Sequence, residues 1–430
     1  MHFDDVLTFK NWIENERRFT KSTTIERMKF YASLFDNPQN SFLSIHVTGT
    51  NGKGSTVAYL RTIFEKKGLK VGTFTSPYIT IFNERIYYNH HYISDEDLLY
   101  YANSILDKYD LIDENHIERP TFFDFITLLC FLYFRDQRDL DIAVIEVGMG
   151  GRLDATNIIN PLLSVITNVS YDHMEQLGNT LELITLEKLG IVKKCVPLIT
   201  SIKENNLLEL CKKKCNELSS ELTIVDFNQL KIKKVDLERS TFDYKTKTNV
   251  EISLNGFHQI ENACLIIDII ECWNKITKSF KQDFYISDEI LYDGLISTKW
   301  PGRFELMNNN PLIYIDGGHN IGCINRICEF ITSLNFKTKR CVVAISSDKE
   351  KEKMIEQLDK TFDELIFTHF TYKRSSNADA LYEMSHAKNK ILIEDIDDVI
   401  NYVYNHQVDF TLFIGSLYFI SEIRPKLMKN

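Results

Sequence analysis

The order of apolar and polar residues along the chain predicts alternating strands and helices. Short apolar runs predict buried strands, and longer segments with apolar residues every three or four positions predict helices. Residues 5–36 are expected to form a helical lead-in. The strands predicted next are 42–47, 70–75, 141–147 and 162–167. The helices predicted among and after them are 56–67, 95–108, 121–135, 185–194 and 258–273.

A second alternating region begins after the turn at Trp300-Pro301-Gly302-Arg303. It contains predicted strands at 312–315, 341–345, 364–368 and 411–414. A chain of 430 residues is longer than one typical hydrophobic core supports, so two domains are expected. We place the boundary at the turn, which gives domains 1–298 and 299–430, both of the α/β class.

A glycine-rich turn follows the first predicted strand. It reads Thr48-Gly49-Thr50-Asn51-Gly52-Lys53-Gly54-Ser55-Thr56. Glycines let backbone N–H groups converge on phosphate oxygens, the next helix directs its positive end at the same anion, and the lysine adds a full charge. The common P-loop pattern is not met, because Val47 and Gly54 replace its first glycine and its Ser/Thr. On its own, the turn is compatible with a phosphate cradle or with an ordinary strand-to-helix connection.

Ligand-capable residues also follow other predicted strands. Glu146 interrupts an apolar run, and a buried acid is costly unless it is paired or binds a metal, so it is a candidate magnesium ligand. His173 follows strand 162–167, where a hydrogen-bonded loop histidine is the plainer interpretation. Asp316 and His319 follow strand 312–315. Open α/β sheets bind ligands at the carboxyl ends of their strands, which favours a site at these positions.

Three other segments leave alternatives open. The aromatic-rich stretch 76–86 is either a lid or a surface loop. Lys188, taken in isolation, is simply a solvated lysine on a helix. The lysine-dense segment 230–234 resembles a solvated edge strand.

Composition gives no support for several classes of protein. The formal charge of −10 gives no general basic field for nucleic acid or an anionic membrane, so an anionic ligand needs a local site. Nine cysteines without C-x-x-C spacing indicate reduced thiols rather than a zinc ribbon. The N-terminus lacks the pattern of a secretory signal, and the apolar run 125–134 is too short to span a membrane. We expect a cytoplasmic protein.

Taken together, the motifs resemble one family. The glycine-rich turn is similar to the phosphate loop of the Mur-type ATP-dependent amide ligases. Within that superfamily, the following motifs resemble folylpolyglutamate synthase and its bifunctional dihydrofolate synthase form: Ser76-Pro77, Phe82-Asn83-Glu84-Arg85-Ile86, Glu146 to Asn157, Glu187-Lys188, Trp300-Pro301-Gly302-Arg303, Asp316-Gly317-Gly318-His319-Asn320 and Gly415-Ser416-Leu417-Tyr418. Gly318 and Ile321 depart from the alanine and proline that the family usually carries.

The resemblance implies a fold and a reaction. Residues 1–298 would form a P-loop, parallel-sheet ATPase domain of the Mur-ligase central type, and residues 299–430 a smaller Rossmann-like domain. ATP would phosphorylate a folate carboxylate, and the amine of L-glutamate would attack the acyl phosphate. The implied partners are ATP, L-glutamate and a folate or dihydropteroate, with Mg²⁺ as cofactor and no nucleic acid or membrane. A monomer is expected.

The resemblance also assigns residues. ATP would be bound by Thr50, Asn51, Gly52, Lys53, Gly54, Ser55, Thr56, Asn262, Arg303 and Asp316. Magnesium would be held by Ser55, Ser76, Glu146 and His173. The catalytic residues would be Lys53, Lys188 and His319, where Lys188 matches a family lysine that is carbamylated. The folate would contact Phe82, Arg85, Phe123 and Asp154.

Other functions match the sequence less well. A P-loop GTPase should carry Asn-Lys-x-Asp, and Asn274-Lys275-Ile276-Thr277 does not match it. A transport ATPase or a nucleotide-binding module without catalysis would not release phosphate in response to folate and glutamate. Within the ligases, the stretch 152–157 resembles the bifunctional form. Polyglutamylation alone, or a different Mur-type amino-acid ligase, are the alternatives.

Overall fold

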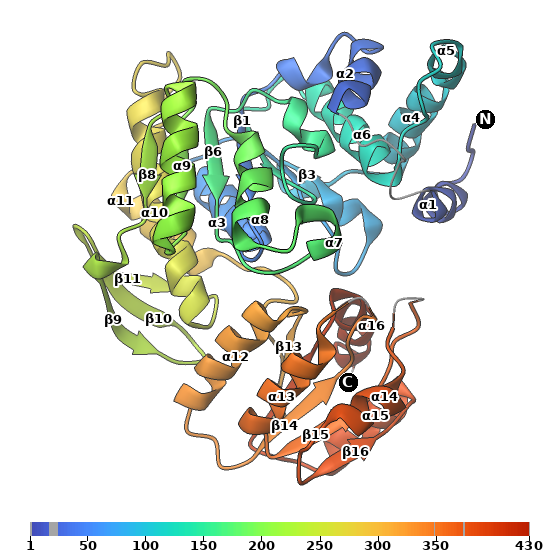
Figure 1. Ribbon diagram of the computed structural model, residues 1–430, viewed down its shortest axis with the longest axis vertical. Helices are drawn as coiled ribbons and strands as arrows, with labels where there is room; N and C mark the ends of the chain where they lie inside the picture. The colour runs from blue at the N-terminus through green and yellow to red at the C-terminus, as the bar shows by residue number, and fades with distance from the viewer. Residues whose placement is uncertain (1, 17–24, 348, 373–374, 430) are drawn as a thin grey trace. The chain divides into compact units, whose positions relative to one another are not determined.

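The computed structural model describes residues 2–16, 25–347, 349–372 and 375–429 (Figure 1). Contacts within the chain divide it into two compact units. The first unit comprises residues 1–230 and 261–297, and the second comprises residues 231–260 and 298–430. Each unit is an α/β structure with its own sheet and hydrophobic core.

The first unit is built on an eight-stranded sheet. Its strands are β1 (Ser44–Thr48), β2 (Val71–Phe74), β3 (Ile86–Tyr88), β4 (His91–Tyr92), β5 (Ile142–Glu146), β6 (Leu163–Ile166), β7 (Leu198–Thr200) and β8 (Leu222–Ile224). Their order in the sheet is β4-β3-β2-β5-β1-β6-β7-β8. Six neighbouring strands of this sheet, β2, β5, β1, β6, β7 and β8, are parallel to one another. The remaining two, β3 and β4, form an antiparallel edge next to β2. The central β1 and β5 are buried throughout, as their apolar sequences predict.

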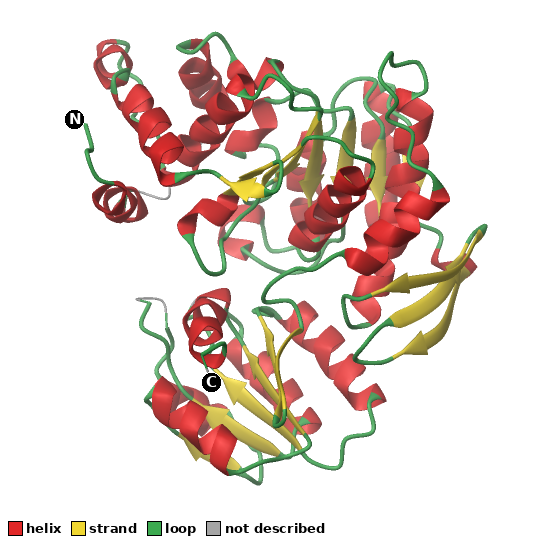
Figure 2. Ribbon diagram, turned by 180° about the vertical axis from the view of Figure 1, so that it is seen from behind, coloured by secondary structure: helices red, strands yellow, loops and turns green. Residues whose placement is uncertain are grey.

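Helices flank this sheet (Figure 2). They are α1 (Val6–Asn15), α2 (Ile25–Ser33), α3 (Lys53–Lys66), α4 (Asp95–Leu106), α5 (Tyr109–Glu114), α6 (Phe122–Asp136), α7 (Met174–Leu177), α8 (Leu181–Lys188), α9 (Asn205–Leu218), α10 (Phe257–Thr277) and α11 (Asp288–Ser297). Ala143 and Ile145 of β5 pack in the cluster formed by α1, α2, α4 and α6. Val144 lies between them and points to the opposite face, because side chains alternate along a strand.

The second unit contains two sheets. Its six-stranded sheet comprises β12 (Glu305–Asn309), β13 (Leu312–Asp316), β14 (Lys339–Val343), β15 (Glu364–Phe367), β16 (Lys390–Leu392) and β17 (Phe410–Ile414), in the order β12-β13-β17-β14-β15-β16. Only β12 is antiparallel to its neighbour. The helices are α12 (Ile321–Ser333), α13 (Lys351–Thr361), α14 (Ala378–Met384), α15 (Ile396–Asn405) and α16 (Leu417–Leu427). A separate three-stranded sheet contains β9 (Leu230–Val235), β10 (Ser240–Tyr244) and β11 (Lys247–Ile252).

Several element bounds differ from those predicted. The helix expected over 185–194 was placed too late, because α8 begins at Leu181 and ends at Lys188, where a 3₁₀ turn follows. The Thr180 side chain caps its start by accepting a hydrogen bond from Leu183 N. The lead-in expected over 5–36 contains α1 and α2, and residues 17–24 of it lie outside the described part of the chain.

Candidate active site

The phosphate loop joins β1 to α3 and is fixed to the loop that follows β6. Thr50 N donates to Asn168 O at 3.0 Å, and Asn51 N donates to Asn168 Oδ1 at 3.0 Å. Gly52 adopts φ +83° and precedes the first residue of α3. That conformation favours glycine, and it starts the helix at Lys53, three residues before the predicted start. The turn therefore presents the N-terminus of a buried helix, where an anion is favoured.

Lys53 lies over this loop. Its Nζ donates to Gly49 O at 3.1 Å and to Thr50 O at 3.3 Å. Ser55 and Thr56, on the first turn of α3, are buried. Asn262 lies beside the loop, because a Cβ at Gly52 would come within 2.7 Å of Asn262 Oδ1. The structure thus brings together the residues of the loop and Asn262 that the resemblance assigned to ATP.

Two of the residues assigned to magnesium are directly linked. Glu146 ends β5 opposite Val47 of β1, and its side chain is buried. Ser76, just after β2, donates its backbone N–H to Glu146 Oε2 at 3.1 Å. His173 precedes α7 with φ +49° and is exposed, with Nε2 3.9 Å from Asp172 Oδ1. The carboxylate and hydroxyl groups suit Mg²⁺, which keeps few protein ligands and takes others from water or phosphate, whereas imidazole is more typical of zinc, copper, iron and nickel sites.

No group of three or more His, Cys, Asp or Glu residues that could hold a metal is present among the described residues. A site made only of such side chains, of the kind that binds zinc, is therefore not found in the described ranges. Of the four residues assigned to magnesium, two, Glu146 and His173, are His, Cys, Asp or Glu. Their assignment therefore does not conflict with the absence of a group of three such residues in the described ranges.

Lys188 is buried, contrary to its interpretation as a solvated lysine. It is the last residue of α8, and its exposed fraction is 2%. The pKa of Lys188 is lowered to about 7, chiefly by burial and then by the charge of Lys53, while the charge of Asp172 opposes both effects. Lys53 and Lys188, which are far apart in the sequence, therefore lie close enough for their charges to repel. A substantial fraction of the Lys188 amine is neutral near neutral pH.

The glycine run after β5 allows α8 to approach. A Cβ at Gly151 would lie 3.0 Å from the carbonyl oxygens of Glu187 and Lys188. Arg152 N donates to Glu187 O at 2.8 Å, and the Arg152 guanidinium forms an ion pair with the Glu187 carboxylate at 2.8 Å. The helix end that carries Lys188 is thereby held against the segment that follows Glu146.

The residues assigned to folate gather around the first turn of α6. The rings of Phe82 and Phe122 are 6.4 Å apart, and the Arg85 guanidinium lies 5.1 Å from the Phe122 ring centre. The Phe123 ring packs against β2 and against the glycine-rich segment that follows β5. It lies 5.8 Å from Phe74, and a Cβ at Gly148 would come within 2.5 Å of it. Phe122 was not singled out from the sequence, where it resembles the other apolar residues of a buried helix.

Asp154 is held by a chain of hydrogen bonds. Its carboxylate accepts from Met149 N at 2.9 Å, from Thr156 N at 3.0 Å and from Thr156 Oγ1 at 2.5 Å. The same Thr156 hydroxyl lies 2.8 Å from Nε2 of the buried His46. Burial raises the pKa of Asp154 to about 6, although these hydrogen bonds oppose the shift. The apolar run around His46 gave no signal of this link.

In the second unit, Asp316 and His319 surround the turn after β13. The Asp316 carboxylate accepts from Phe304 N at 2.8 Å and from Gly318 N at 2.6 Å. Burial raises the pKa of Asp316, and the charge of Arg303 opposes this. His319 Nδ1 lies 2.9 Å from Gly317 O. Arg303, Asp316 and His319 thus form one local group.

Gly318 and Ile321 stand where the family usually carries alanine and proline. A Cβ at Gly318 would lie 3.0 Å from Asp316 Oδ1 and 3.0 Å from Ile327 Cδ1, so alanine would be tight here. The missing proline is compensated locally, because Asn320 caps α12 by accepting from Cys323 N at 2.9 Å.

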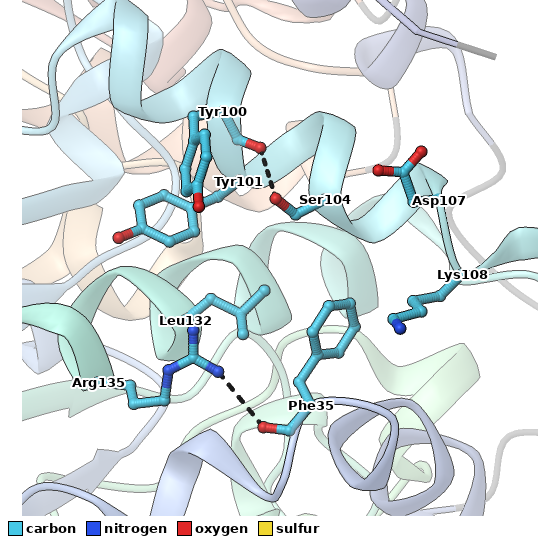
Figure 3. A pocket seen from close by; sticks show the side chains of 8 residues that line it. All are labelled: Phe35, Tyr100, Tyr101, Ser104, Asp107, Lys108, Leu132 and Arg135. Atoms are coloured by element: carbon cyan, nitrogen blue, oxygen red, sulfur yellow. Dashed lines mark hydrogen bonds between the residues drawn. The ribbon is translucent and has the colours of Figure 1, made fainter.

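A pocket of about 300 Å³ lies elsewhere in the first unit (Figure 3). It is lined by Phe35, Tyr100, Tyr101, Ser104, Asp107, Lys108, Leu132 and Arg135. The Arg135 guanidinium faces Phe35 O at 3.4 Å and also pairs with Asp136. Its lining contains none of the residues assigned to ATP, magnesium or folate, so this pocket is separate from the candidate site.

Comparison with known proteins identifies the family. The Mur ligase middle domain matches residues 47–269, and the Mur ligase glutamate ligase domain matches residues 302–417. Over 427 residues the chain is 36% identical to the dihydrofolate synthase/folylpolyglutamate synthase of Bacillus subtilis, covering 97% of this chain and 98% of that protein. The chain belongs to the folylpolyglutamate synthase and dihydrofolate synthase family of Mur ligases. It is therefore an ATP-dependent ligase.

Solved structures agree with this placement. The crystal structure of folylpolyglutamate synthase from Thermotoga maritima superimposes with a TM-score of 0.85 at 30% identity, covering 98% of this chain and 96% of that one. An FPGS–AMPPCP complex superimposes with a TM-score of 0.83 at 28% identity, covering 99% and 100%. Among the described residues, none of the helices combines the length and apolar character needed to cross a membrane.

Proposed function

We propose that this ligase joins L-glutamate to the carboxylate of a folate, and that it also converts dihydropteroate to dihydrofolate. The observation that carries the proposal is the surroundings of the end of β5. Glu146 ends β5 beside β1, the strand that leads into the phosphate loop, and two residues later a Cβ at Gly148 would come within 2.5 Å of the Phe123 ring. A substrate with an aromatic body and a carboxylate to be phosphorylated suits such a junction.

The reaction balances without a nucleophilic side chain. A carboxylate oxygen of the folate attacks the γ-phosphorus of ATP, the bond to the bridging oxygen breaks, and ADP leaves. The amine of glutamate then attacks the acyl carbon, the new C–N bond forms, and inorganic phosphate leaves with the loss of the amine proton. Catalysis of such steps depends on positioning and on neutralising phosphoryl charge.

The first unit supplies groups for that purpose. Lys53 and the backbone N–H groups from Gly52 to Ser55 would hold the β- and γ-phosphates, since those of Thr50, Asn51 and Thr56 are bonded within the protein. Ser55, Ser76, Glu146 and His173 would hold Mg²⁺, which when bound offsets phosphate charge and orients the transferred group. In support, Lys53 already lies over the loop and Glu146 already contacts Ser76.

Lys188 is proposed to carry a carbamate. CO₂ adds to a neutral amine, and the lowered pKa of Lys188 makes that form available near pH 7. The product would replace a cation that repels Lys53 with an anion that attracts it. Incubation with ¹³C-bicarbonate followed by ¹³C NMR should give a carbamate signal that is lost in Lys188→Ala, and its absence from the unchanged protein would refute the proposal.

The second unit would serve the incoming amine and the nucleotide. We propose that Arg303 and Asp316 contact ATP and that His319 orients glutamate. Their support is the local network that fixes all three, in which Asp316 accepts two backbone N–H groups and Nδ1 of His319 faces Gly317 O. We also propose a monomer in the cytoplasm, where ATP is abundant and the free cysteines of this chain would stay reduced.

The test is an assay of phosphate release with two alternative acceptors. Dihydropteroate and a tetrahydrofolate are supplied separately, each with ATP, Mg²⁺ and L-glutamate. Release that requires both glutamate and either acceptor is expected. Turnover with tetrahydrofolate alone would favour polyglutamylation only, and turnover with neither would favour a different Mur-type amino-acid ligase. The name of the Bacillus subtilis relative, which includes both activities, favours the bifunctional outcome.

A further inference from the structure

The Asp154 carboxylate is held by bonds within the first unit and keeps one acceptor position. Its Oδ1 accepts from Thr156 N and from Thr156 Oγ1, whereas its Oδ2 accepts only from Met149 N among the described residues. An ionised carboxylate accepts about four hydrogen bonds, so one position remains on Oδ2. Because Asp154 is 8% exposed, that position is available to a ligand that donates an N–H or O–H group.

Behind Asp154, Thr156 contacts a histidine that the proposed reaction does not use. His46 lies in β1 and is fully buried, and its Nε2 is 2.8 Å from Thr156 Oγ1. The other ring nitrogen, Nδ1, is buried and has no hydrogen-bond partner within the described ranges. Most buried polar side-chain atoms have a partner, which makes the unpaired Nδ1 unusual.

The unpaired nitrogen gives the hydrogen-bond chain a direction. The Thr156 hydroxyl has one proton, and donating it to Asp154 leaves its oxygen to accept from His46 Nε2–H. In that direction Nδ1 carries no proton and is only an unpaired acceptor. In the reverse direction Thr156 would donate to Nε2, and Nδ1–H would be a buried donor without a partner. Orphaned buried N–H groups are rarer than unpaired acceptors, so the direction toward Asp154 is favoured.

Protonation of either end would disturb this chain. Burial lowers the pKa of His46 to about 3, and the charge of Lys193 acts in the same direction, so the ring has one proton at neutral pH. A proton on Asp154 Oδ1 would compete with the Thr156 hydroxyl proton and force the chain to reverse. The charge of Asp124, on the first turn of α6, favours that protonation, and the chain from His46 opposes it.

We propose that His46 and Thr156 are positioning residues that keep Asp154, itself proposed to contact the folate, in its hydrogen-bond-accepting form. This inference rests on the proposed function. The open position belongs to Oδ2, which is bonded to Met149 N, and a Cβ at the neighbouring Gly148 would come within 2.5 Å of the Phe123 ring. An acceptor near an aromatic ring suits a heterocycle with N–H groups at its edge. His46 and Thr156 act through Asp154 and touch no reacting atom.

Variants of Thr156 separate this role from a general structural one. Thr156→Val removes the hydroxyl at nearly constant volume, and Thr156→Ser retains it. Thr127→Val is the control, because Thr127 is also fully buried but its hydroxyl has no partner in the described part of the chain. Thr156→Val loses a hydrogen bond to a charged group, so the acidic limb of kcat/KM for the folate should move up by about one to two pH units. Thr156→Ser and Thr127→Val should keep the wild-type profile.

The pH dependence distinguishes the two explanations. The acceptor is dihydropteroate, or tetrahydrofolate if the wild type uses only that one. At pH 7, kcat/KM for it should fall about two- to tenfold in Thr156→Val, and at pH 9 the loss should disappear because Asp154 is ionised in both proteins. The profile for ATP at saturating acceptor should not move, although Lys188 titrates in the same range. An equal loss at every pH, or equal shifts for both substrates, would overturn the proposal.

Replacement of His46 tests the inner end of the chain. His46→Phe should move the acidic limb for the folate in the same direction as Thr156→Val. Added to Thr156→Val it should cause no further shift, because the path through the hydroxyl is already removed. A further shift in the double variant would contradict a chain that runs through Thr156.

The tautomer of His46 tests the chain without any substrate, and also if His46→Phe does not fold. Long-range ¹H–¹⁵N NMR of the full chain with ¹⁵N-labelled histidine distinguishes Nε2–H from Nδ1–H, and the His46 signal is identified by its change in Thr156→Val. We expect Nε2–H from about pH 5 to pH 9. A ring protonated on Nδ1, or on both nitrogens, would overturn the proposal. A wild-type protein that uses no folate would refute the proposed function, while the tautomer would still test the chain.

Discussion

Lys53 and Lys188 share one neighbourhood but have different surroundings. Lys53 donates to two carbonyl oxygens of its own loop. Lys188 is the last residue of α8, and only 2% of its surface is exposed. Because like charges repel, each ammonium group makes the protonated form of the other less favourable. An anion placed between them would be attracted by both. The two lysines should therefore respond differently to mutation and to pH.

Replacing Lys53 by alanine should lower turnover about a hundredfold. Removal of one charge-stabilising donor typically costs about 3 kcal/mol in the transition state. Phosphate release with saturating folate and glutamate measures the effect, and circular dichroism checks the fold. Lys66→Ala is the control, since Lys66 lies on the same helix in an exposed ion pair with Asp293. Near-normal turnover in Lys53→Ala would contradict the role given to Lys53.

Burial of Lys188 should make stability depend on pH. The pKa of Lys188 is lowered to about 7 from 10.5. Below about pH 7 both the folded and the unfolded chain hold its proton, and the full cost of burying the charge is present. Between these two pKa values only the unfolded chain keeps the proton, so the cost falls as pH rises.

The variant Lys188→Met removes this cost at every pH. Its free energy of unfolding, minus that of the wild type, should therefore decrease by about 2–3 kcal/mol from pH 7 to pH 9 in buffers free of CO₂. Urea unfolding followed by tryptophan fluorescence measures it, because Trp12 and Trp273 both belong to the first unit. A difference that does not change with pH would show that Lys188 is not a buried ammonium.

Sequence reasoning proposed residue types for the candidate site but could not predict their surroundings. Lys188 on a short helix looks the same from sequence whether it is solvated or buried. Its burial depends on Gly151 admitting the end of α8, a contact between segments more than 30 residues apart. The link from His46 through Thr156 to Asp154 was missed for a similar reason, since it joins residues 110 positions apart.

The loop from β1 to α3 depends on glycine at Gly49. Its Cβ would overlap the Thr167 hydroxyl, and its φ of +155° already disfavours other residues. Gly49→Ala should cost at least about 3 kcal/mol through strain and overlap, and it should weaken ATP binding. Urea unfolding and nucleotide titration measure the two effects.

Gly68 offers a matched control. It follows α3 with φ +89°, and no atom lies within 4 Å of its Cβ position. Gly68→Ala should cost only about 1 kcal/mol and leave nucleotide binding unchanged. Equal effects of the two substitutions would mean that crowding by Thr167 is not what requires glycine at position 49.

The elements that were predicted best are the buried strands. Apolar runs placed β1, β2, β5 and β6 to within two residues, because both faces of such strands are covered. The short antiparallel strands β3 and β4 were missed, since they lie at the sheet edge and carry mixed side chains. The start of α8 was missed although Thr180 gives a usable capping signal.

The division of the whole molecule is less simple than one boundary. Contacts assign residues 231–260 to the second unit, in which Val235, Leu237 and Phe257 pack against its hydrophobic core. A cut after residue 298, the boundary proposed from the Pro301-Gly302 turn, would remove these side chains from residues 299–430. No local sequence pattern indicates that residues 231–260 belong to the second unit, because they lead directly into a long helix that continues in the first unit.

A chain made of residues 231–260, a Gly/Ser linker and residues 298–430 should therefore be more stable than residues 299–430 alone. Covering the core with Phe257 and its neighbours should contribute roughly 2 kcal/mol or more. Thermal unfolding compares the two chains. Phe257→Ala in the linked chain should lower its midpoint toward that of 299–430, and equal midpoints for the two chains would show that residues 231–260 do not stabilise the unit.

Helix α10 begins within the second unit and continues into the first, since the division falls between residues 260 and 261. The chain also passes between the units after residues 230 and 297. A chimera of two relatives joined at a single point would therefore receive parts of one unit from both parents. Exchanging whole units requires three junctions, one of them inside a helix. Only sequences compatible along α10 could be recombined without disturbing it.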